Sequence, residues 1–292
     1  MTEENLRKKI REMLAEDLGR GDVTSNTLIS PRLRARAEVI SKQEGVLAGV
    51  REAAMVFQEV GVSVKIVRRD GERIAPGEVI LKLEGPARKI LSAERVALNL
   101  MMRMSGIATA TRELIDRARK ENPRVTVAAT RKTVPLLRYF DKRAVAVAGG
   151  SPHRFDLSDQ VLIKDNHLKL VGSITAAVRK FKQRVGSGKI EVETTSPEEA
   201  LEAARAGADI VMLDNMTPEQ IARTIKMLEE AGLRKRVSLE ASGGITPDNI
   251  AEYAATGVDI ISTSYMTMRS PAIDMALKIK EAVRSERLGR AK

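Results

Sequence analysis

The chain contains no cysteine and no tryptophan, and aromatic residues make up only 2% of its 292 residues. Without cysteine there is no disulfide scaffold, no thiolate nucleophile and no metal site with cysteine ligands. So few aromatic rings leave little material for stacking nucleic-acid bases. No apolar run approaches the roughly 20 residues that a membrane-spanning helix needs. We therefore expect a cytoplasmic protein that binds neither nucleic acid nor membrane.

The charge of the chain is strongly positive, because 50 Lys and Arg residues outnumber 39 Asp and Glu residues and give a net charge of +11. Such a balance suits a partner with several negative charges, which includes nucleic acid, an acidic membrane surface and a small phosphorylated substrate. The sequence shows no basic recognition helix, zinc finger or RNA-binding signature. A nucleic-acid binder is therefore the weakest of these interpretations.

Short apolar runs, rich in β-branched residues, recur from about residue 124 onward. Most are nearly continuous in apolar residues, which is typical of parallel strands covered on both faces. The runs predict strands at 124–130, 144–150, 160–166, 189–195, 209–215, 236–242 and 258–264.

Helical segments separate the later strands, and three of them begin with a hydroxyl residue followed by proline, which is typical of a helix N-terminus. These starts are Ser196-Pro197, Thr217-Pro218 and Thr246-Pro247. Repeated β-loop-α units indicate either a (β/α) barrel or an open doubly wound sheet. The number of strands and the absence of a Gly-x-Gly-x-x-Gly turn favour the barrel.

Residues 1–110 read differently and predict an α+β open sandwich domain built on an antiparallel sheet. Turns at Asp70-Gly71 and Pro76-Gly77 indicate hairpins. The fold class expected is thus α/β, with this N-terminal domain followed by the barrel at 111–270. We expect a last helix, roughly 271–285 within the segment 271–292, to pack back on the first domain.

Charged or small polar residues follow the predicted barrel strands. In a parallel barrel the functional site lies at the carboxyl ends of the strands, so these side chains should converge on one electropositive cavity that contains two carboxylates. The residues are Arg131, Lys132, His153, Arg154, Lys164, Glu193, Asp214, Ser242, Gly243 and Gly244.

The residue types suggest which ligands this cavity takes. Arginine and lysine suit carboxylate and phosphate groups, and the Gly243-Gly244 pair before a capped helix suits phosphate. Glu193 and Asp214 either share a Mg²⁺ that bridges a diphosphate or face a developing carbocation. The alternative is that both acids only form ion pairs with Lys132 and Lys164.

Other conspicuous segments have simpler interpretations. The methionine-rich stretch 98–106 predicts core packing. The charged runs 141–143 and 234–236 predict solvated surface. Of the two histidines, His153 lies beside Arg154 in a tight loop and is expected to contact a ligand, whereas His167 is expected to be structural.

Several motifs together resemble the quinolinate phosphoribosyltransferase family. They occur in the family's order and cover nearly the whole chain, at 16–25, 93–109, 129–138, 149–167, 191–194, 209–216 and 239–246. The resemblance implies condensation of quinolinate with phosphoribosyl diphosphate in the presence of Mg²⁺. The products would be nicotinate mononucleotide, pyrophosphate and CO₂, in a step of NAD synthesis. It also implies a homodimer or larger assembly with shared active sites.

The resemblance further implies roles for individual residues. The quinolinate carboxylates should meet Arg131, His153, Arg154 and Lys164. Arg95 should reach into the site of the neighbouring subunit. The diphosphate, the ribose and the metal should lie near Lys132, Glu193 and Asp214, and the 5′-phosphate should lie at Ser242, Gly243 and Gly244.

One position departs from the family pattern. The family has a glycine that helps to bind the 5′-phosphate after the last barrel strand, and this chain has Ser264 there. The serine hydroxyl could itself donate to the phosphate.

Two alternatives stay open. One is a related phosphoribosyltransferase that acts on nicotinate or another acid. The other is a non-catalytic barrel that binds a phosphorylated metabolite, although the presence of both Glu193 and Asp214 speaks against it.

Overall fold

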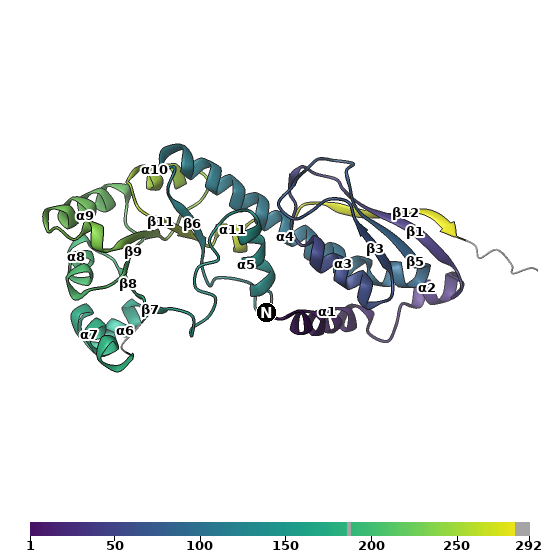
Figure 1. Cartoon of the computed structure of the whole chain (residues 1–292), viewed down its shortest axis with the longest axis horizontal. Helices are drawn as coiled ribbons and strands as arrows, with labels where there is room; N and C mark the ends of the chain where they lie inside the picture. Colours follow the sequence, from purple (N-terminus) through teal and green to yellow (C-terminus); the bar gives the residue numbers. More distant parts are fainter. Residues whose placement is uncertain (186–187, 284–292) are drawn as a thin grey trace, which may run out of the picture. The chain divides into compact units, whose positions relative to one another are not determined.

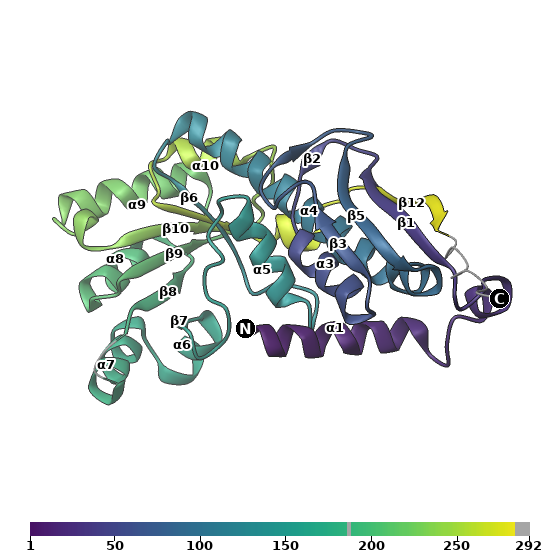
Figure 2. The same ribbon diagram turned by 45° about the vertical axis from the view of Figure 1, so that its right-hand side comes forward.

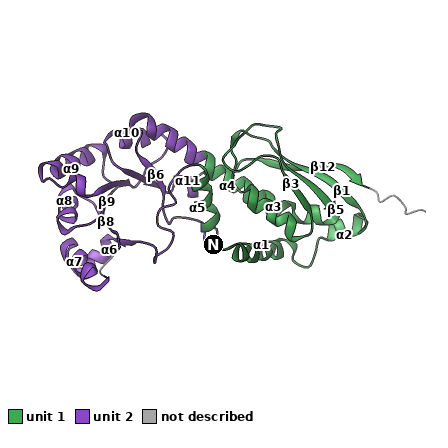
Figure 3. Ribbon diagram, viewed as in Figure 1, with its two compact units in different colours: residues 1–109, 139–148, 270–292 green, residues 110–138, 149–269 purple. Residues whose placement is uncertain are grey.

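The computed structural model describes residues 1–185 and 188–283. These residues form two compact units (Figure 3). Unit 1 comprises 1–109, 139–148 and the segment that begins at 270, and unit 2 comprises 110–138 and 149–269. The long helix α4 (Ala87–Glu121) contributes residues to both units. No helix among the described residues is both long and apolar enough to cross a membrane.

Unit 1 is built on an antiparallel sheet with the strand order β12-β1-β5-β3. The strands are β12 (Met275–Val283), β1 (Arg34–Ser41), β5 (Val79–Pro86) and β3 (Ser63–Ile66). Residues of β1 point alternately to a covered and to an open face, as expected for a sheet that packs on one side. A separate pair joins β2 (Gly45–Val46) to β4 (Arg73–Ile74).

Helices make up much of the rest of unit 1 (Figure 1). Among the described residues they are α1 (Glu3–Leu18), α2 (Val23–Leu28), α3 (Val50–Glu59), the first part of α4, and α5 (Arg138–Val147). The prediction that the methionine-rich stretch packs in the core is confirmed, because Met101 and Met104 are both 0% exposed.

The structure corrects two sequence predictions in this unit. Residues 275–283 form strand β12, paired with β1, where a helix at 271–285 was predicted; residues 284–292 of that predicted segment lie outside the described residues. The segment does belong to unit 1. Turns form at Asp70-Gly71 and Pro76-Gly77, but the strands that flank each turn do not pair with each other, because β4 pairs with β2.

The charged run at 141–143 is also not solvated surface. Asp141 is 0% exposed and accepts two hydrogen bonds of 2.8 Å from the guanidinium of Arg103. Lys142 is 2% exposed. Arg143 forms ion pairs with Glu52 at 3.1 Å and Asp70 at 2.8 Å. Asp141 and Arg143 thus form ion pairs within unit 1, and Lys142 is buried beside them in the sequence.

Unit 2 contains a six-stranded parallel sheet with the order β6-β11-β10-β9-β8-β7, which confirms the predicted α/β class (Figure 2). The strands are β6 (Thr126–Ala129), β7 (Val161–Ile163), β8 (Ile190–Thr194), β9 (Ile210–Asp214), β10 (Ser238–Ser242) and β11 (Ile260–Thr263). The strand predicted at 144–150 is wrong, because α5 runs to Val147.

A single residue continues the sheet of unit 2 beyond β6. Ser151 forms a parallel bridge with Ala128 of β6, in which its backbone N donates to Val127 at 2.8 Å and its O accepts from Ala129 at 2.9 Å. This bridge holds the start of the 151–154 loop next to β6. The loop carries His153 and Arg154, so the bridge keeps both residues near the carboxyl end of β6.

Helices follow the strands of unit 2 and cover the outside of the sheet (Figure 2). Among the described residues they are α6 (Asp165–Val171), α7 (Ile174–Val185), α8 (Pro197–Ala206), α9 (Pro218–Glu230), the 3₁₀ turn η1 (Arg234–Arg236), α10 (Ile250–Ala255) and α11 (Tyr265–Met268). The predicted caps at Ser196 and Thr217 are confirmed. The cap at Thr246 is not, since α10 begins three residues later than predicted, after Asn249.

Candidate active site

A cavity of about 330 Å³ lies at the carboxyl ends of the strands of unit 2. Its lining brings together most of the residues that the sequence singled out: Arg131, Lys132, His153, Arg154, Lys164, Glu193, Asp214 and Ser242. Thr130, Leu162, Met212, Glu240 and Ser262 complete much of the wall. The strand ends therefore do converge on one cavity, and its wall is rich in cationic side chains.

A second cavity of about 230 Å³ has the remaining small polar residues in its wall. It is lined by Gly243, Gly244, Thr246, Ser264, Tyr265 and Arg269, among others. Thr130, Lys132, Ser242 and Ser262 belong to the walls of both cavities. The two spaces are thus neighbours that share a wall, which suits a ligand with two separate anionic ends.

Two arginines form one side of the larger cavity. The Nε of Arg131 is buried and has no hydrogen-bond partner among the described residues. Arg154 is only 8% exposed, and its Nη1 donates to the backbone oxygen of Gln160 at 3.2 Å. Burial, and then repulsion from Arg131, lowers the pKa of Arg154. Two guanidinium groups that repel each other beside an unused donor form a site for an anion.

The wall of the larger cavity also contains two carboxylates on neighbouring strands. Glu193 lies in β8 and Asp214 in β9. Lys164 Nζ donates to Glu193 Oε2 at 2.6 Å. Burial raises the pKa of Asp214, and repulsion from Glu193 raises it further, while Lys164 opposes this shift. Glu193 therefore does form an ion pair with Lys164, as the alternative interpretation of the sequence predicted.

These two acids are a suitable donor set for Mg²⁺. Both offer carboxylate oxygens, the ligands that this ion prefers. Their mutual repulsion, which contributes to the raised pKa of Asp214, is a cost that a divalent cation would relieve.

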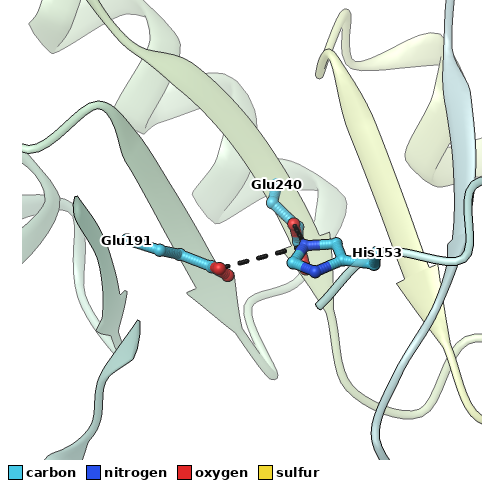
Figure 4. Close-up of side chains that lie close together, drawn as sticks. All are labelled: His153, Glu191 and Glu240. Atoms are coloured by element: carbon cyan, nitrogen blue, oxygen red, sulfur yellow. Dashed lines mark hydrogen bonds and ion pairs between the residues drawn. The ribbon is translucent and has the colours of Figure 1, made fainter. Parts of the chain in front are cut away.

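His153, whose ring the sequence predicts to contact a ligand, lines the larger cavity and also has protein partners. Its backbone has φ of +51°, a conformation that is uncommon outside glycine. Its Nδ1 accepts a hydrogen bond from the backbone N of Arg154 at 2.6 Å. Its Nε2 lies 2.8 Å from Glu240 Oε2 and 3.9 Å from Glu191 Oε2 (Figure 4). Both ring nitrogens are thus engaged by the protein.

Glu191 and Glu240 are site residues that the sequence reasoning missed, together with Gln160, which donates to Glu191 at 3.0 Å. Both glutamates are 0% exposed. The alternation of side chains along a strand could have identified both glutamates, because Glu191 precedes Glu193 by two residues and Glu240 precedes Ser242 by two. Residues i and i+2 of a strand point to the same face. His153, Glu191 and Glu240 also place possible metal-ligand atoms within 4.8 Å of one another.

The wall of the smaller cavity depends on a glycine. Gly243 has φ of +98°, and a Cβ there would collide with Asn215. Ser264 precedes α11, but its side chain makes no capping hydrogen bond. A bare backbone at Gly243 and a hydroxyl at Ser264 therefore both border the space.

Two residues singled out in the sequence lie elsewhere. Arg95 is exposed on α4 in unit 1, and neither cavity of unit 2 is lined by it. His167 accepts a hydrogen bond at Nδ1 from the backbone N of Lys164 at 2.9 Å, at the start of α6. Its ring supports the local turn in the way expected of a structural histidine.

The sequence matches two family models that together span most of the chain. The model of the quinolinate phosphoribosyl transferase N-terminal domain matches residues 22–105, and that of the C-terminal domain matches residues 107–278.

Relatives and solved structures agree with these matches. A probable nicotinate-nucleotide pyrophosphorylase (carboxylating) from Methanothermobacter thermautotrophicus is 49% identical over 272 residues, covering 93% of this chain and 98% of the relative. The rat nicotinate-nucleotide pyrophosphorylase (carboxylating) is 39% identical, covering 87% and 84%. The solved structure of the nicotinate-nucleotide pyrophosphorylase from Francisella tularensis has a TM-score of 0.89 at 34% identity, covering 96% of this chain and 98% of that one.

Proposed function

This chain belongs to the quinolinate phosphoribosyltransferase family, and we propose that its two adjoining cavities transfer the phosphoribosyl group of 5-phosphoribosyl 1-diphosphate to quinolinate. The transfer is coupled to decarboxylation and gives nicotinate mononucleotide, pyrophosphate and CO₂, in NAD biosynthesis. The observation that carries this proposal is the shared wall of a cation-rich cavity and a smaller glycine-lined one.

The positive charge of the site offsets the electrostatic repulsion between the two anionic substrates of this reaction. A dicarboxylate and a sugar diphosphate repel each other strongly in a medium of reduced dielectric. Arg131, Arg154, Lys132 and Lys164 offset that repulsion from the wall of one cavity. Arg131 and Arg154 bind the carboxylates of quinolinate, since the unused Nε of Arg131 is a buried donor.

The smaller cavity takes the 5′-phosphate. Gly243 and Gly244 let the backbone approach the phosphate closely, and Ser242 and Ser264 offer hydroxyl groups in the same wall. Lys132 borders both cavities, so its ammonium is placed to neutralise the diphosphate that leaves from the sugar.

Departure of pyrophosphate leaves an oxocarbenium-like centre on the ribose. Glu193 and Asp214 stabilise this positive charge from the carboxyl ends of neighbouring strands. The same two carboxylates would hold Mg²⁺, which supplies charge neutralisation for the diphosphate when bound.

The pyridine nitrogen of quinolinate then forms the bond to the sugar and becomes cationic. The bond between the ring and the adjacent carboxylate then breaks and CO₂ leaves, and the electron pair stays on that ring carbon, where the neighbouring cationic nitrogen stabilises it until the carbon takes up a proton. No nucleophilic side chain is required, which agrees with a chain that contains no cysteine.

The proposal extends to the assembly. Arg95 is exposed in unit 1, and we infer that it completes the site of a second copy of the chain in a homodimer or larger assembly. A location in the cytoplasm stays a prediction.

An assay with quinolinate and nicotinate as competing acceptors tests the function. We expect pyrophosphate and CO₂ in equal amounts with quinolinate, dependent on Mg²⁺, and little turnover of nicotinate. Transfer to nicotinate instead would identify the related phosphoribosyltransferase. Binding of phosphoribosyl diphosphate without release of pyrophosphate would identify a non-catalytic barrel.

A further inference from the structure

Two fully buried glutamates, Glu191 and Glu240, connect to Arg154 through separate chains of hydrogen bonds. Glu240 also lines the larger cavity. Glu240 in β10 meets the ring of His153, and that ring accepts the backbone N–H of Arg154. Glu191 in β8 accepts from the side chain of Gln160 at 3.0 Å, and the backbone oxygen of Gln160 accepts from Arg154 Nη1 at 3.2 Å. Both the backbone N–H and the guanidinium of Arg154 are thus linked by hydrogen bonds to a buried glutamate, the first through His153 and the second through Gln160.

The His153 ring acts as a connector in this arrangement. Since Nδ1 accepts from Arg154 N, the proton of a neutral ring lies on Nε2 and points to Glu240 at 2.8 Å. The positive φ of His153, +51°, persists only if surrounding contacts hold it. Glu240 provides such a contact, because it fixes the direction of the ring and hence the turn that presents Arg154.

A metal ion is a competing explanation for the cluster of His153, Glu191 and Glu240. One oxygen of each glutamate, Oε1, has no hydrogen-bond partner among the described residues. However, the other oxygens already accept from His153 and Gln160. Arg154 and Lys164 also supply positive charge to Glu191, so a further cation would face cations that are already present.

We propose that Glu240 and Glu191 are positioning residues for the quinolinate carboxylates, acting through His153 and Gln160 on Arg154. This inference rests on the proposed function and deepens it. It also assigns His153 a positioning role, in which its ring holds Arg154 in place.

The test compares Glu240→Leu with Glu240→Gln in the full-length protein. Leucine removes the acceptor for His153 Nε2, so we expect the KM for quinolinate to rise about tenfold or more, because small displacements of a binding group are costly. Glutamine keeps an acceptor oxygen, so its KM should stay within about threefold of wild type. The KM for phosphoribosyl diphosphate should change little in either variant.

A double-mutant cycle separates a role through His153 from an independent one. If Glu240 acts only through the ring, Glu240→Leu should add no further loss to His153→Ala. Additive losses would overturn the proposal. Gln160→Ala provides a second route to the same test, with an expected rise in quinolinate KM of about threefold or more, and it applies even if Glu240→Leu does not fold.

Thr224→Val is the matched control for lost stability. Thr224 is also 0% exposed in unit 2 and bonds to the backbone of Gln220 on α9 at 2.8 Å. We expect a lower melting temperature and an unchanged quinolinate KM.

The failures of the two proposals are distinguishable. Absence of quinolinate turnover in the wild type would overturn the proposed function and this inference with it. Turnover by the wild type, with an unchanged quinolinate KM in folded Glu240→Leu and Gln160→Ala, would overturn the inference alone. Stoichiometric binding of Mn²⁺ or Zn²⁺ in calorimetry that Glu240→Gln abolishes would also overturn it, in favour of a metal site.

Discussion

The Nζ of Lys164 lies 2.6 Å from Oε2 of Glu193. The lysine that we propose for quinolinate binding and the carboxylate that we propose for the ribose and Mg²⁺ therefore form an ion pair with each other. Lys164 also lowers the pKa of Asp214, which burial and Glu193 raise. The charges of Glu193 and Asp214 are thus both coupled to this lysine.

Replacing Lys164 by alanine should therefore affect both binding and pH dependence. We expect the quinolinate KM to rise about tenfold, as for loss of a charged hydrogen-bond partner. Without the lysine the pKa of Asp214 rises further, so the acidic limb of the pH profile of kcat/KM should move to higher pH. Lys169→Ala is the control, because Lys169 is exposed and pairs with Asp165. An acidic limb that does not move would contradict the coupling.

The two arginines should discriminate between the substrates. Arg131→Ala or Arg154→Ala should raise the quinolinate KM about tenfold to a hundredfold, because each removes a charge-assisted partner of a carboxylate. The KM for phosphoribosyl diphosphate should change much less, as steady-state kinetics with either substrate varied will measure. Comparable losses for both substrates would argue against the carboxylate role.

A shared site predicts complementation between inactive variants. At quinolinate concentrations well below the KM, where Lys164→Ala alone keeps about one tenth of wild-type activity, mixed Arg95→Ala and Lys164→Ala proteins should regain about one quarter of wild-type activity after subunit exchange, because half of the dimers are hybrids with one intact site. Exchange is followed with differently tagged chains. Hybrids that form without regaining activity would show that Arg95 does not serve the neighbouring site.

The serine at position 264 should contribute to phosphate binding. Its side chain borders the smaller cavity and makes no capping bond, so Ser264→Gly should raise the KM for phosphoribosyl diphosphate about threefold to tenfold. The quinolinate KM should not change. A KM for the sugar diphosphate equal to or below that of the wild type would mean that glycine serves the phosphate as well.

Buried Glu191 should make the stability of the protein depend on pH. Burial, and then repulsion from Glu240, raises its pKa from 4.5 to about 8. The folded state keeps a proton that the unfolded state releases, so the free energy of unfolding should fall as the pH rises from 4.5 to about 8. Glu191→Gln has no such proton and should show a flatter profile in urea denaturation at pH 5 and pH 8. Equal slopes for both proteins would contradict the shift.

Local apolar patterns predicted most strands of unit 2. They failed at residues 144–150, which belong mostly to unit 1, because a charged residue interrupts the helical pattern there. Six predicted barrel strands form. The seventh, at 144–150, belongs largely to α5, in which Asp141, Ala144 and Val145 are buried at helical spacing. Because Asp141 is charged, the sequence did not identify it as a buried residue of this helix face. Its burial depends on Arg103, 38 residues away.

The amino-acid order alone determined the β/α alternation, the cation-rich strand ends and the family, because side-chain period, helix capping and motif spacing are local properties. Only the tertiary structure decided that 275–283 joins β1 as a strand. It also decided that His153 faces Glu191 and Glu240 and not open solvent. The reason is physical: strand pairing and the burial of charge depend on partners far along the chain, and their free energies override the weak preferences of neighbouring residues.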